Sequence, residues 1–490
     1  MNDQPISIAI AGSGTAGLLS AIMLRKAFPV AKITVISSQD IGIVGVGEGS
    51  TEHWKQFMQR CDIPLAEMIV ATKATHKYGI RFENWSLAFP DYFHSIWGDE
   101  NIFAWRLFPL YAKLIQEGRP LTTSTASVGL LTDKVKRLNL HENTNQFHFD
   151  TFALNKYFQL VAARRGITFA DGVINDIILD SETGNIASCE LNNGFTVHAD
   201  FWIDATGFKR VLSSKLGNDD WRSFGDFLLC DSALAFPTES DPNGKIRSYT
   251  RARALSSGWA WEIPTQERRG NGYVFSSAFS TLDDAVDEMS KLLRRDIVPA
   301  RTFKFDPGYL TSPWVKNCCA VGLSSSFVEP LEATSIGSTI QSLNLLIPFI
   351  ASYRPHHAAS QKSFNKSFNI MMDNILTMIR LHYISDRRDT EFWKAAATMK
   401  VNDSLQELLD LWQETTLPRD FIGQTDGQMF LVPHLLHVAQ GQNVIDKSHI
   451  PVALRNLNIE EAVINDMALA SHNRVNHELV DHAESLNEIF

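Results

Sequence analysis

Cysteine is scarce in this chain, and its few cysteines lack metal-binding spacing. The 490 residues include 5 cysteines, an odd number that contains no C-x-x-C pair. A disulfide framework or a structural zinc site needs more cysteines at regular spacings. The sequence therefore predicts reduced thiols, a cytoplasmic location and no metal site.

The chain also lacks long apolar runs, internal repeats and an excess of basic residues. The stretch nearest to a membrane span, residues 343–352, is interrupted by Pro348 and is too short. The N-terminus has no charged segment of the secretory type. A net charge of −10 disfavours nucleic acid and anionic membranes as partners. The remaining composition, 44% hydrophobic and 20% charged, is typical of a globular protein large enough for roughly two or three structural units.

Residues 6–37 predict a dinucleotide-binding unit. An apolar run over 6–11 is followed by a G-x-G-x-x-G motif, a segment with helical spacing from residue 18 and a second apolar run over 32–37. Glycines in this position make a tight turn and let backbone N–H groups approach a pyrophosphate at the helix N-terminus. An ordinary strand-turn-helix is the alternative. We expect the cofactor contacts at Gly12, Gly14, Thr15, Ala16 and Gly17.

The ribose end of this unit is unusual. An acidic residue is expected about twenty positions beyond the glycines, where it binds the ribose hydroxyls. The chain has Ser37 there instead, and no basic residue suited to a 2′-phosphate. We therefore expect Ser37 to contact the ribose more weakly than a carboxylate would. The nucleotide should be held loosely, and NADP is not favoured.

Two later segments suggest contacts with a flat cofactor. A glycine-rich loop after the second strand contains Val46, Gly47 and Glu48, which we expect to lie close to a ring system. A flexible connector is the alternative reading. Aromatic residues gather over 89–111; such a cluster is more often core, but its density fits a pocket for a flat ligand.

The middle of the chain predicts an α/β fold. A helix over 152–165 precedes short alternating runs at 173–178, 186–191 and 195–197, which are typical of a β-meander. A buried strand then ends at Gly207, and another leads to Gly322; both glycines are expected at the cofactor. Residues 228–305 alternate like a mixed sheet. This order predicts a two-dinucleotide-binding FAD fold, Rossmann-like, with a mixed β-sheet and a helical C-terminal part.

Several motifs occur together, in order, over about residues 6 to 395. After the first glycine motif come Gly45-Val46-Gly47-Glu48, Lys77 before Tyr78-Gly79-Ile80, Trp259-x-Trp261-x-Ile263-Pro264, Glu329-Pro330-Leu331-Glu332, and His382-Tyr383 with residues 387–393. Together they resemble the flavin-dependent halogenases of the tryptophan-halogenase type. The W-x-W-x-I-P motif is the most specific, because it separates these halogenases from flavin monooxygenases.

This resemblance implies an enzyme in which FADH2, O2 and chloride or bromide give hypohalous acid. A lysine, matched by Lys77, delivers the halogen to an electron-rich aromatic substrate, either as a haloamine or by hydrogen-bonding the acid. Burial would lower the pKa of such a lysine. Glu332 matches the catalytic glutamate, and Thr334 and Ser335 match the halide-binding positions. An FAD-dependent aromatic hydroxylase and a non-catalytic flavin-binding protein are the alternatives.

The resemblance also divides the chain and indicates its partners. Residues 1–345 would form the FAD-binding body, including an aromatic substrate wall at 77–111, and residues 346–490 a mostly helical substrate-binding part. The stretch 430–442 lacks the tyrosine pair and the glutamate of enzymes acting on free tryptophan, so an indole-like or phenolic substrate is expected. A separate flavin reductase would supply FADH2, and a homodimer is left open. Trp259 and Trp261 would wall the tunnel, and the substrate would contact Phe93, His94, Trp97 and Pro433.

Overall fold

The structure, a computed structural model, describes most of the chain. The described residues are 5–38, 41–42, 48–95, 104–121, 134–136, 146–240, 244–353, 358–415, 427–456, 458, 460, 462–466 and 479–487. Three of the predicted site residues, Val46, Gly47 and Trp97, lie outside this part. For Glu48 only the backbone is described.

The predicted nucleotide-binding unit is confirmed as a strand-helix-strand. Strands β1 (Ser7–Ala11) and β2 (Lys32–Ser37) lie side by side in parallel, and helix α1 (Thr15–Ala27) connects them. They belong to a six-stranded sheet in the order β21-β22-β13-β1-β2-β9. The other strands are β9 (Thr168–Asp171), β13 (Phe201–Asp204), β21 (Trp314–Val315) and β22 (Cys318–Ala320). Because both faces of β1 are covered, its sequence is continuously apolar rather than alternating.

The predicted helix and meander are also confirmed. Helix α6 (Thr151–Arg164) begins at an N-cap, Asp150, whose side chain accepts from the backbone N–H of Ala153 at 2.9 Å. Strands β10 (Ile174–Leu179), β11 (Ile186–Leu191) and β12 (Thr196–His198) follow as an antiparallel sheet. The chain then returns as β13 beside β1, which brings Gly207 back to the first glycine turn.

A second, seven-stranded sheet forms the middle of the molecule, in the order β19-β15-β18-β17-β16-β5-β6. Its strands are β5 (Gly79–Glu83), β6 (Asp91–Ser95), β15 (Ser232–Glu239), β16 (Thr250–Ala254), β17 (Gly258–Pro264), β18 (Arg268–Phe275) and β19 (Arg301–Lys304). β5 pairs with β16 in parallel and the other pairs are antiparallel, so the predicted mixed sheet is confirmed. Trp259 and Trp261 point to the same face of the buried strand β17.

Short elements connect the two sheets. Strands β3 (Glu48–Gly49), β4 (Thr75–His76) and β8 (Phe147–Phe149) form a small sheet beside helices α2 (His53–Arg60) and α3 (Leu65–Thr72). A further small sheet contains β14 (Trp221–Ser223), β20 (Gly308–Leu310) and β23 (Ser326–Phe327). Helices α7 (Val211–Lys215) and α8 (Leu282–Leu293) lie between the larger strands along the chain.

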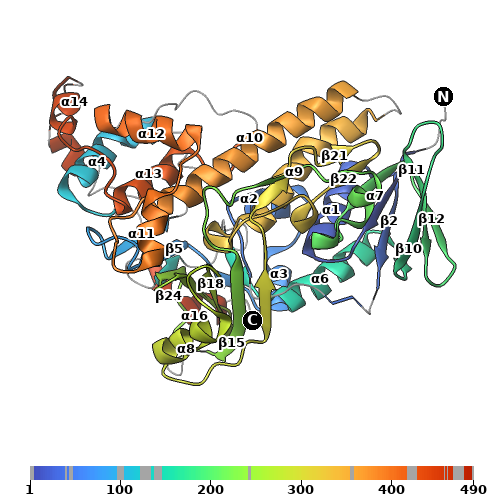
Figure 1. Ribbon diagram of the computed structural model, residues 1–490, viewed down its shortest axis with the longest axis horizontal. Coiled ribbons are helices and arrows are strands. Elements are labelled where there is room, and N and C mark those ends of the chain that lie inside the picture. The colour runs from blue at the N-terminus through green and yellow to red at the C-terminus, as the bar shows by residue number, and fades with distance from the viewer. Residues whose placement is uncertain are drawn as a thin grey trace.

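The C-terminal part is mostly helical, as predicted, within the described residues. It comprises α9 (Thr334–Ala351), α10 (Ala358–His382), α11 (Glu391–Thr398), α12 (Asp403–Glu414), α13 (Val432–Gly441), α14 (Ile450–Asn456) and α16 (His482–Asn487). The long helix α10 leads to one end of the molecule, where α11–α14 gather around α4 (Ala104–Glu117) (Figure 1). A short strand, β24 (Leu479–Asp481), pairs with β7 (Lys134–Lys136). The division at residue 345 stays a prediction, and α9 continues across that position.

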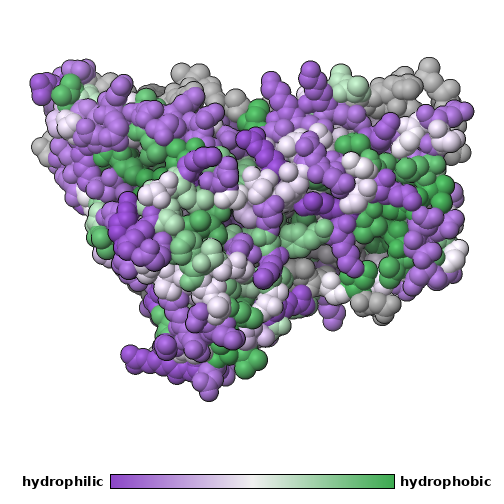
Figure 2. All heavy atoms as spheres, in the orientation of Figure 1, coloured by the Kyte–Doolittle hydropathy of each residue, from purple (hydrophilic) through white to green (hydrophobic). Residues whose placement is uncertain are grey.

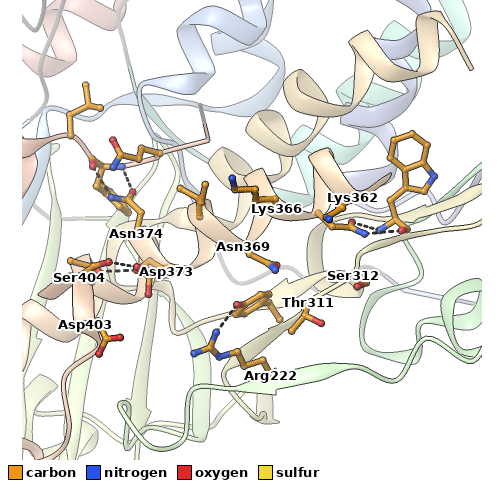
Figure 3. Close-up of a pocket in the computed structure, with 18 of the residues that line it drawn as sticks. Arg222, Thr311, Ser312, Lys362, Lys366, Asn369, Asp373, Asn374, Asp403 and Ser404 are labelled. Atoms are coloured by element: carbon orange, nitrogen blue, oxygen red, sulfur yellow. Dashed lines mark hydrogen bonds between the residues drawn. The ribbon is translucent and has the colours of Figure 1, made fainter. Parts of the chain in front are cut away.

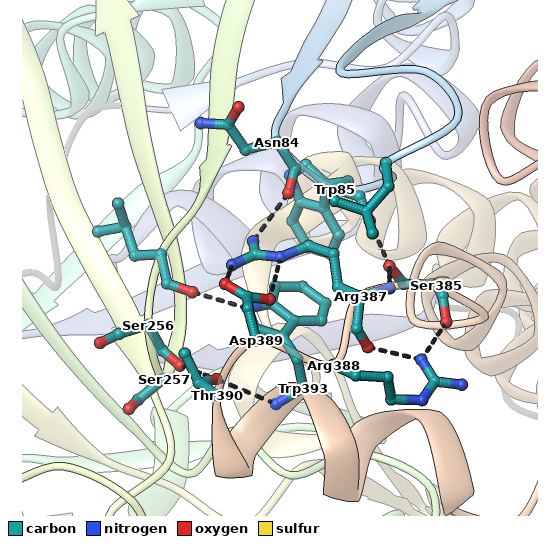
Figure 4. Close-up of polar contacts among 12 residues, drawn as sticks. Asn84, Trp85, Ser256, Ser257, Ser385, Arg387, Arg388, Asp389, Thr390 and Trp393 are labelled. Carbon is teal, nitrogen blue, oxygen red and sulfur yellow. Dashed lines mark hydrogen bonds and ion pairs between the residues drawn. The ribbon is translucent and has the colours of Figure 1, made fainter.

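The segment 387–393 attaches the helical part to the seven-stranded sheet (Figure 4). Arg387 donates to the backbone oxygen of Asn84 at 2.8 Å and pairs with Asp389 at 2.7 Å. The guanidinium of Arg387 lies over the Trp393 ring, 4.4 Å from its centroid. The indole N–H of Trp393 in turn donates to the backbone oxygen of Leu255 at 2.8 Å. These contacts explain why Arg387 is buried although the other charged residues of the segment are exposed: the segment joins the turns of the sheet to α11.

The surface gives no indication of a membrane-spanning helix. Among the helices of the described part, none is both long and apolar enough to cross a bilayer. Figure 2 shows a face that is hydrophilic over most of its area, with hydrophobic residues gathered in patches, one of them over β2 and the neighbouring strands.

Candidate active site

A groove runs along the carboxyl ends of β1 and β2. It has a volume of about 340 Å³ and is lined by residues 12–16 of the first glycine motif, Ser37, Gly207 and Gly322. The predicted contact Gly17 is not among the lining residues, because it packs against the backbone of Gly12. A Cβ atom on Gly12, whose φ is +107°, would lie 2.4 Å from the backbone oxygen of Ala205. At Gly14, by contrast, a Cβ would meet nothing within 4 Å, so this glycine faces the open groove.

The start of α1 suits a bound phosphate. Helix α1 begins at Thr15, and its N-cap residue Gly14 has no side chain with which to satisfy the first N–H groups. These N–H groups and the positive end of the helix dipole face the groove. The lining therefore fits the pyrophosphate of a dinucleotide such as FAD, with Ser37 at the predicted ribose position.

A second hollow of about 150 Å³ continues from this groove. The two share Leu323, Ser335 and Ile336 as lining residues, and Trp261 is part of the wall of the second. Its wall is mostly apolar and includes Thr334 and Gly49. This arrangement fits a flavin ring system placed beyond the pyrophosphate.

Thr334 and Ser335 form the first turn of α9 at this second hollow. The chain makes its left-handed turn one residue earlier, at Ala333, whose φ is +53°. Ser335 itself is helical, so its backbone conformation does not require a glycine. The backbone N–H groups of this turn are therefore available to an anion.

Lys77 lies at the edge of the second hollow, between β4 and β5. Its side chain is buried, and Nζ donates to the backbone oxygen of Ser50 at 2.9 Å. Burial lowers its pKa from 10.5 to about 8, against the attraction of Glu332 and Glu52. A Cβ on Gly49, which lines the hollow, would lie 3.3 Å from Nζ. The ammonium group is therefore close to the flavin-sized space, and its lowered pKa matches the sequence expectation.

Glu332 lies in a 3₁₀ turn (Pro330–Glu332) that immediately precedes α9. It is 2% exposed. Oε2 lies 2.6 Å from Nδ1 of His94, and Oε1 lies 2.7 Å from Nε2 of His382. Burial by itself raises the pKa of this carboxyl group, but the two imidazoles hold it well below its usual value. Glu332 is therefore an anion fixed by two rings.

Three polar residues at this site were not predicted from the sequence. Nε2 of His94 lies 2.8 Å from Nδ1 of His434 on α13, and Nε2 of His434 lies 3.6 Å from Oε1 of Glu52. His382 completes the other side of Glu332. His382 could have been suspected from the His382-Tyr383 motif. His434 lies in the stretch 430–442, which was interpreted only by the tyrosine pair and glutamate that it lacks, and nothing in the local sequence singles out Glu52.

The two tryptophans of β17 have different surroundings. Trp261 lines the second hollow, and Trp259 packs beside it with a ring centroid distance of 6.1 Å. The indole N–H of Trp259 donates to Oε2 of Glu329 at 3.1 Å, and the Tyr383 hydroxyl donates to the same oxygen at 2.9 Å. Burial raises the pKa of Glu329 to about 7. The orientation of Trp259 is thus held by a hydrogen bond, not by packing alone.

The predicted substrate residues are distributed over two places. His94 lies against Glu332, and Phe93, its neighbour on β6, is half-buried beside Arg81. Pro433 instead lines a separate cleft of about 1370 Å³ between α10, α12 and the start of α13. Figure 3 shows that this cleft is polar, with Lys362 and Lys366 toward one end and Asp403 toward the other. Pro433 therefore faces a different space from Glu332, although its neighbour His434 contacts His94.

The described residues give little support for metal or disulfide chemistry at the site. Within the described residues, no group of three or more His, Cys, Asp or Glu side chains is arranged to hold a metal ion. All 5 cysteines are buried and unpaired. A dinucleotide groove that opens into a ring-sized hollow, on a Rossmann-like fold, defines a flavin-dependent oxidoreductase.

The comparison with known proteins narrows this class. The tryptophan halogenase family model matches residues 7–456, and the chain belongs to that family. It shares 31% identity over 444 residues with the tryptophan 7-halogenase RebH of Lentzea aerocolonigenes, covering 84% of this chain and 83% of that protein. A flavin-dependent halogenase from Xanthomonas campestris superposes with a TM-score of 0.87 at 29% identity, over 99% and 98% of the two chains. BrvH, a flavin-dependent halogenase from Brevundimonas sp. BAL3, gives a TM-score of 0.82 at 27% identity, over 99% of each chain.

The predicted family and enzyme class are therefore confirmed. The relatives are halogenases and not hydroxylases, so the chain is an enzyme of the flavin-dependent halogenases, which act on aromatic substrates. Such enzymes in general use reduced flavin, a halide and O2, and depend on a separate flavin reductase.

Proposed function

We propose that this protein uses FADH2, O2 and chloride or bromide to halogenate an indole-like or phenolic substrate. One observation carries the proposal: a buried lysine, Lys77, lies at the edge of the flavin-sized hollow and is electrostatically coupled to the buried carboxylate of Glu332. A hydroxylase would not need this pair.

The cofactor and the halide would occupy adjoining parts of one continuous hollow. The glycine turn and the N-terminus of α1 would hold the pyrophosphate of FAD, and Ser37 the ribose. The backbone N–H groups of Thr334 and Ser335 would hold the halide at the ring. When bound, reduced FAD together with O2 supplies the oxidising equivalent that converts halide to hypohalous acid. The remaining expected cofactor contacts are Thr15, Ala16, Val46, Gly47, Glu48, Gly207 and Gly322.

Lys77 and Glu332 would then carry out the transfer. With its pKa near 8, Lys77 is available near neutral pH both as an ammonium that hydrogen-bonds hypohalous acid and as an amine that takes the halogen. The halogen forms a bond to a ring carbon as its bond to oxygen breaks, and the hydroxide takes a proton from the Lys77 ammonium and leaves as water; the ring proton later restores that ammonium. The carboxylate of Glu332 stabilises the cationic ring and takes the proton released from that carbon.

Trp259 and Trp261 would separate the reaction at the flavin from the halogenation of the substrate. Trp261 closes the flavin-sized hollow, and Trp259 backs it, held by Glu329. A substrate as large as an indole is kept away from the flavin by this wall, while hypohalous acid is small enough to pass. Hydroxylation of the substrate at the flavin is thereby avoided.

The environment of α13 favours a substrate without an ammonium group. The relative RebH is a tryptophan halogenase, but here α13 contributes His434 and His437 to the site. Burial lowers the pKa of His434 to about 4 and that of His437 well below its usual value, so both rings are neutral. Neutral rings do not compensate a buried amino-acid head group. Indole should therefore be preferred over free tryptophan.

The test is an assay with FADH2, bromide and a panel of indoles, phenols and free tryptophan, with products identified by mass. We expect brominated indoles or phenols, and a kcat/KM for indole above that for tryptophan. Hydroxylated products would contradict the halogenase proposal. A clear preference for tryptophan would contradict only the proposed substrate.

A further inference from the structure

The flavin-sized hollow has one polar side chain to which the proposed function assigns no role. Its wall is mostly apolar, and the polar side chains among its described lining residues are Thr250, Thr334 and Ser335. The last two belong to the proposed halide site at the start of α9. Thr250 lies on β16 and is 8% exposed. A hydroxyl in an apolar wall is costly unless a partner binds it, so its hydrogen bonds indicate what it can hold.

A chain of hydrogen bonds fixes the direction of the Thr250 hydroxyl. It starts at the backbone oxygen of Pro264, the last residue of the W-x-W-x-I-P motif, which accepts the hydroxyl proton of Thr75 at 2.7 Å. Thr75 has no second proton on that oxygen, so the oxygen accepts from Nδ1 of His148 at 3.3 Å. Nε2 of the neutral ring is then an acceptor, and the Thr250 hydroxyl donates to it at 2.9 Å.

His148 is a neutral ring because it is buried beside a cation. Its side chain is fully buried, and burial, together with Lys77 and His482, holds its pKa well below the usual value. The one proton of the Thr250 hydroxyl is therefore directed to the ring. Within the described part of the chain, the Thr250 oxygen accepts no hydrogen bond in return, although a hydroxyl oxygen has two lone pairs. Thr250 thus presents an acceptor, and no donor, to the hollow that it lines.

This edge of the hollow adjoins Lys77. Gly49 lines the hollow and pairs with His148 between strands β3 and β8. A Cβ on Gly49 would lie 3.3 Å from Nζ of Lys77 and 3.5 Å from Cδ2 of His148. Lys77 and His148 therefore lie against the same glycine, which places no side chain between them and the hollow. Because His148 also contacts Thr250, the free acceptor of the hollow is on the side of the lysine.

We propose that Thr250 binds hypohalous acid on its way from the flavin-sized hollow to Lys77. This rests on the proposed function, which forms the acid in that hollow. Hypohalous acid is small and neutral, and its O–H group can donate to the Thr250 oxygen. The halogen is then at the free end of the molecule, where Lys77 can meet it. No bond is made or broken at this step. A halide ion has no proton to donate, so the same acceptor does not bind it.

Thr250→Val is the decisive variant, because valine keeps the shape of the side chain and lacks the hydroxyl. The reaction contains FADH2, O2, bromide, indole and an excess of a soluble β-diketone, which is brominated by hypohalous acid that escapes from the protein. We expect FADH2 oxidation to be unchanged. The fraction of bromine found on the β-diketone should rise by roughly five-fold, the usual effect of one neutral hydrogen bond. Thr250→Ser, which keeps the hydroxyl, should restore the wild-type fraction.

The matched control is Thr238→Val. Thr238 is also 8% exposed and belongs to the same sheet, on β15, but it binds the side chain of Asn271 and does not line the hollow. We expect its fraction of escaped bromine to equal that of the unaltered enzyme. An unchanged fraction in Thr250→Val, or an equal rise in Thr250→Ser, would overturn the proposal. A wild-type enzyme that brominates neither indole nor the β-diketone would instead overturn the proposed function.

FAD binding separates hypohalous acid from the flavin as the ligand of Thr250. Flavin rings also carry N–H groups, which the same acceptor could bind. We expect Thr250→Val to bind FAD with the affinity of the unaltered protein in a fluorescence titration. A weaker affinity would assign the hydroxyl to the flavin and overturn the proposal.

A last measurement needs neither flavin nor turnover. In ¹⁵N-histidine-labelled protein, the two ring nitrogens of His148 report which of them carries the proton. We expect the proton on Nδ1, with Nε2 accepting from Thr250. A proton on Nε2 would turn the Thr250 hydroxyl toward the hollow as a donor, and this result would overturn the proposal.

Discussion

At the scale of single residues, burial lowers the pKa of Lys77 and by itself raises the pKa of Glu332. The lysine loses part of its affinity for a proton because its ammonium is removed from water. The carboxyl group is equally buried, but two imidazole rings stabilise its charge. A lysine with a lowered pKa and an ionised carboxylate are thus present together near neutral pH.

Lys77→Ala should separate flavin chemistry from halogen transfer. We expect FADH2 oxidation by O2 to stay nearly unchanged, because Lys77 is not part of the nucleotide groove, while halogenated product falls below detection. Oxygen consumption and product mass, measured in the same reaction, check this. Lys73→Ala is the matched control, since Lys73 is on the surface and pairs with Glu267. Halogenation by Lys77→Ala at a rate near wild type, with the same regiochemistry, would make free hypohalous acid the reagent.

Glu332→Gln removes the charge but keeps the shape of the side chain. We expect product formation to slow by about 10²–10⁴-fold, the usual loss for a positioned acid-base group. The double variant with Lys77→Ala should be little worse than Lys77→Ala alone, because residues that act as a unit are not additive. Single-turnover product formation measures both effects, and a fully additive loss would show that the two act independently.

Burial of Lys77 should also reduce stability. A pKa lowered from 10.5 to about 8 means that the unfolded chain binds this proton more tightly, which corresponds to about 3 kcal/mol below pH 8. This penalty disappears as pH rises from 8 to 10.5, where the unfolded state also loses the proton. Lys77→Met should therefore raise the free energy of unfolding near pH 7, and the gain should shrink toward pH 10.5. Denaturant unfolding at the two pH values tests this, and a gain independent of pH would contradict it.

At the scale of elements, the turn between β1 and α1 shows two different uses of glycine. Gly12 and Gly17 are required because other backbone approaches them closely: a Cβ on Gly17 would lie 2.0 Å from the oxygen of Gly12. Gly14 has open space before it, so its small size leaves room for a ligand. The same motif therefore serves close packing at two positions and leaves open space for the proposed cofactor at one.

Gly14→Val should weaken FAD binding strongly and leave the fold largely intact. The new side chain would occupy the groove where the pyrophosphate is expected, without a clash in the protein itself. Gly12→Ala, the comparison variant, should lower the unfolding temperature as well, because its Cβ would clash with Ala205. Flavin fluorescence titration and thermal unfolding measure the two effects. Unchanged FAD affinity in Gly14→Val would contradict the position assigned to the cofactor.

At the scale of the whole molecule, the site is built where two sheets and the helical part meet. The six-stranded sheet contributes the nucleotide groove, the seven-stranded sheet contributes Trp259, Trp261 and His94, and α13 contributes His434. The FAD-binding body contains one G-x-G-x-x-G motif, and the sequence has no second one for a nicotinamide cofactor. We therefore expect another protein to reduce the flavin.

The purified protein should not halogenate with NADH, FAD, bromide and O2 alone. Addition of a flavin reductase should start product formation, because reduced flavin then reaches the groove by diffusion. Product mass with and without the reductase is the measurement, and chemically reduced FAD is the positive control. NADH-dependent halogenation by the protein alone would show that it reduces its own flavin.

The sequence by itself determined the parts whose signal is local. The glycine turn between two apolar runs, the meander and the mixed sheet depend on neighbouring residues, and the structure contains all of them. Lys77, Glu332 and the tryptophan pair came from short motifs, although their roles stay predictions. Packing alone decided the surroundings of Glu332. His94 and His434 are 340 positions apart, and they meet because α13 lies against β6. Periodicity shows which side of a helix is buried, but not which distant side chain lies opposite, since that depends on how every intervening element packs.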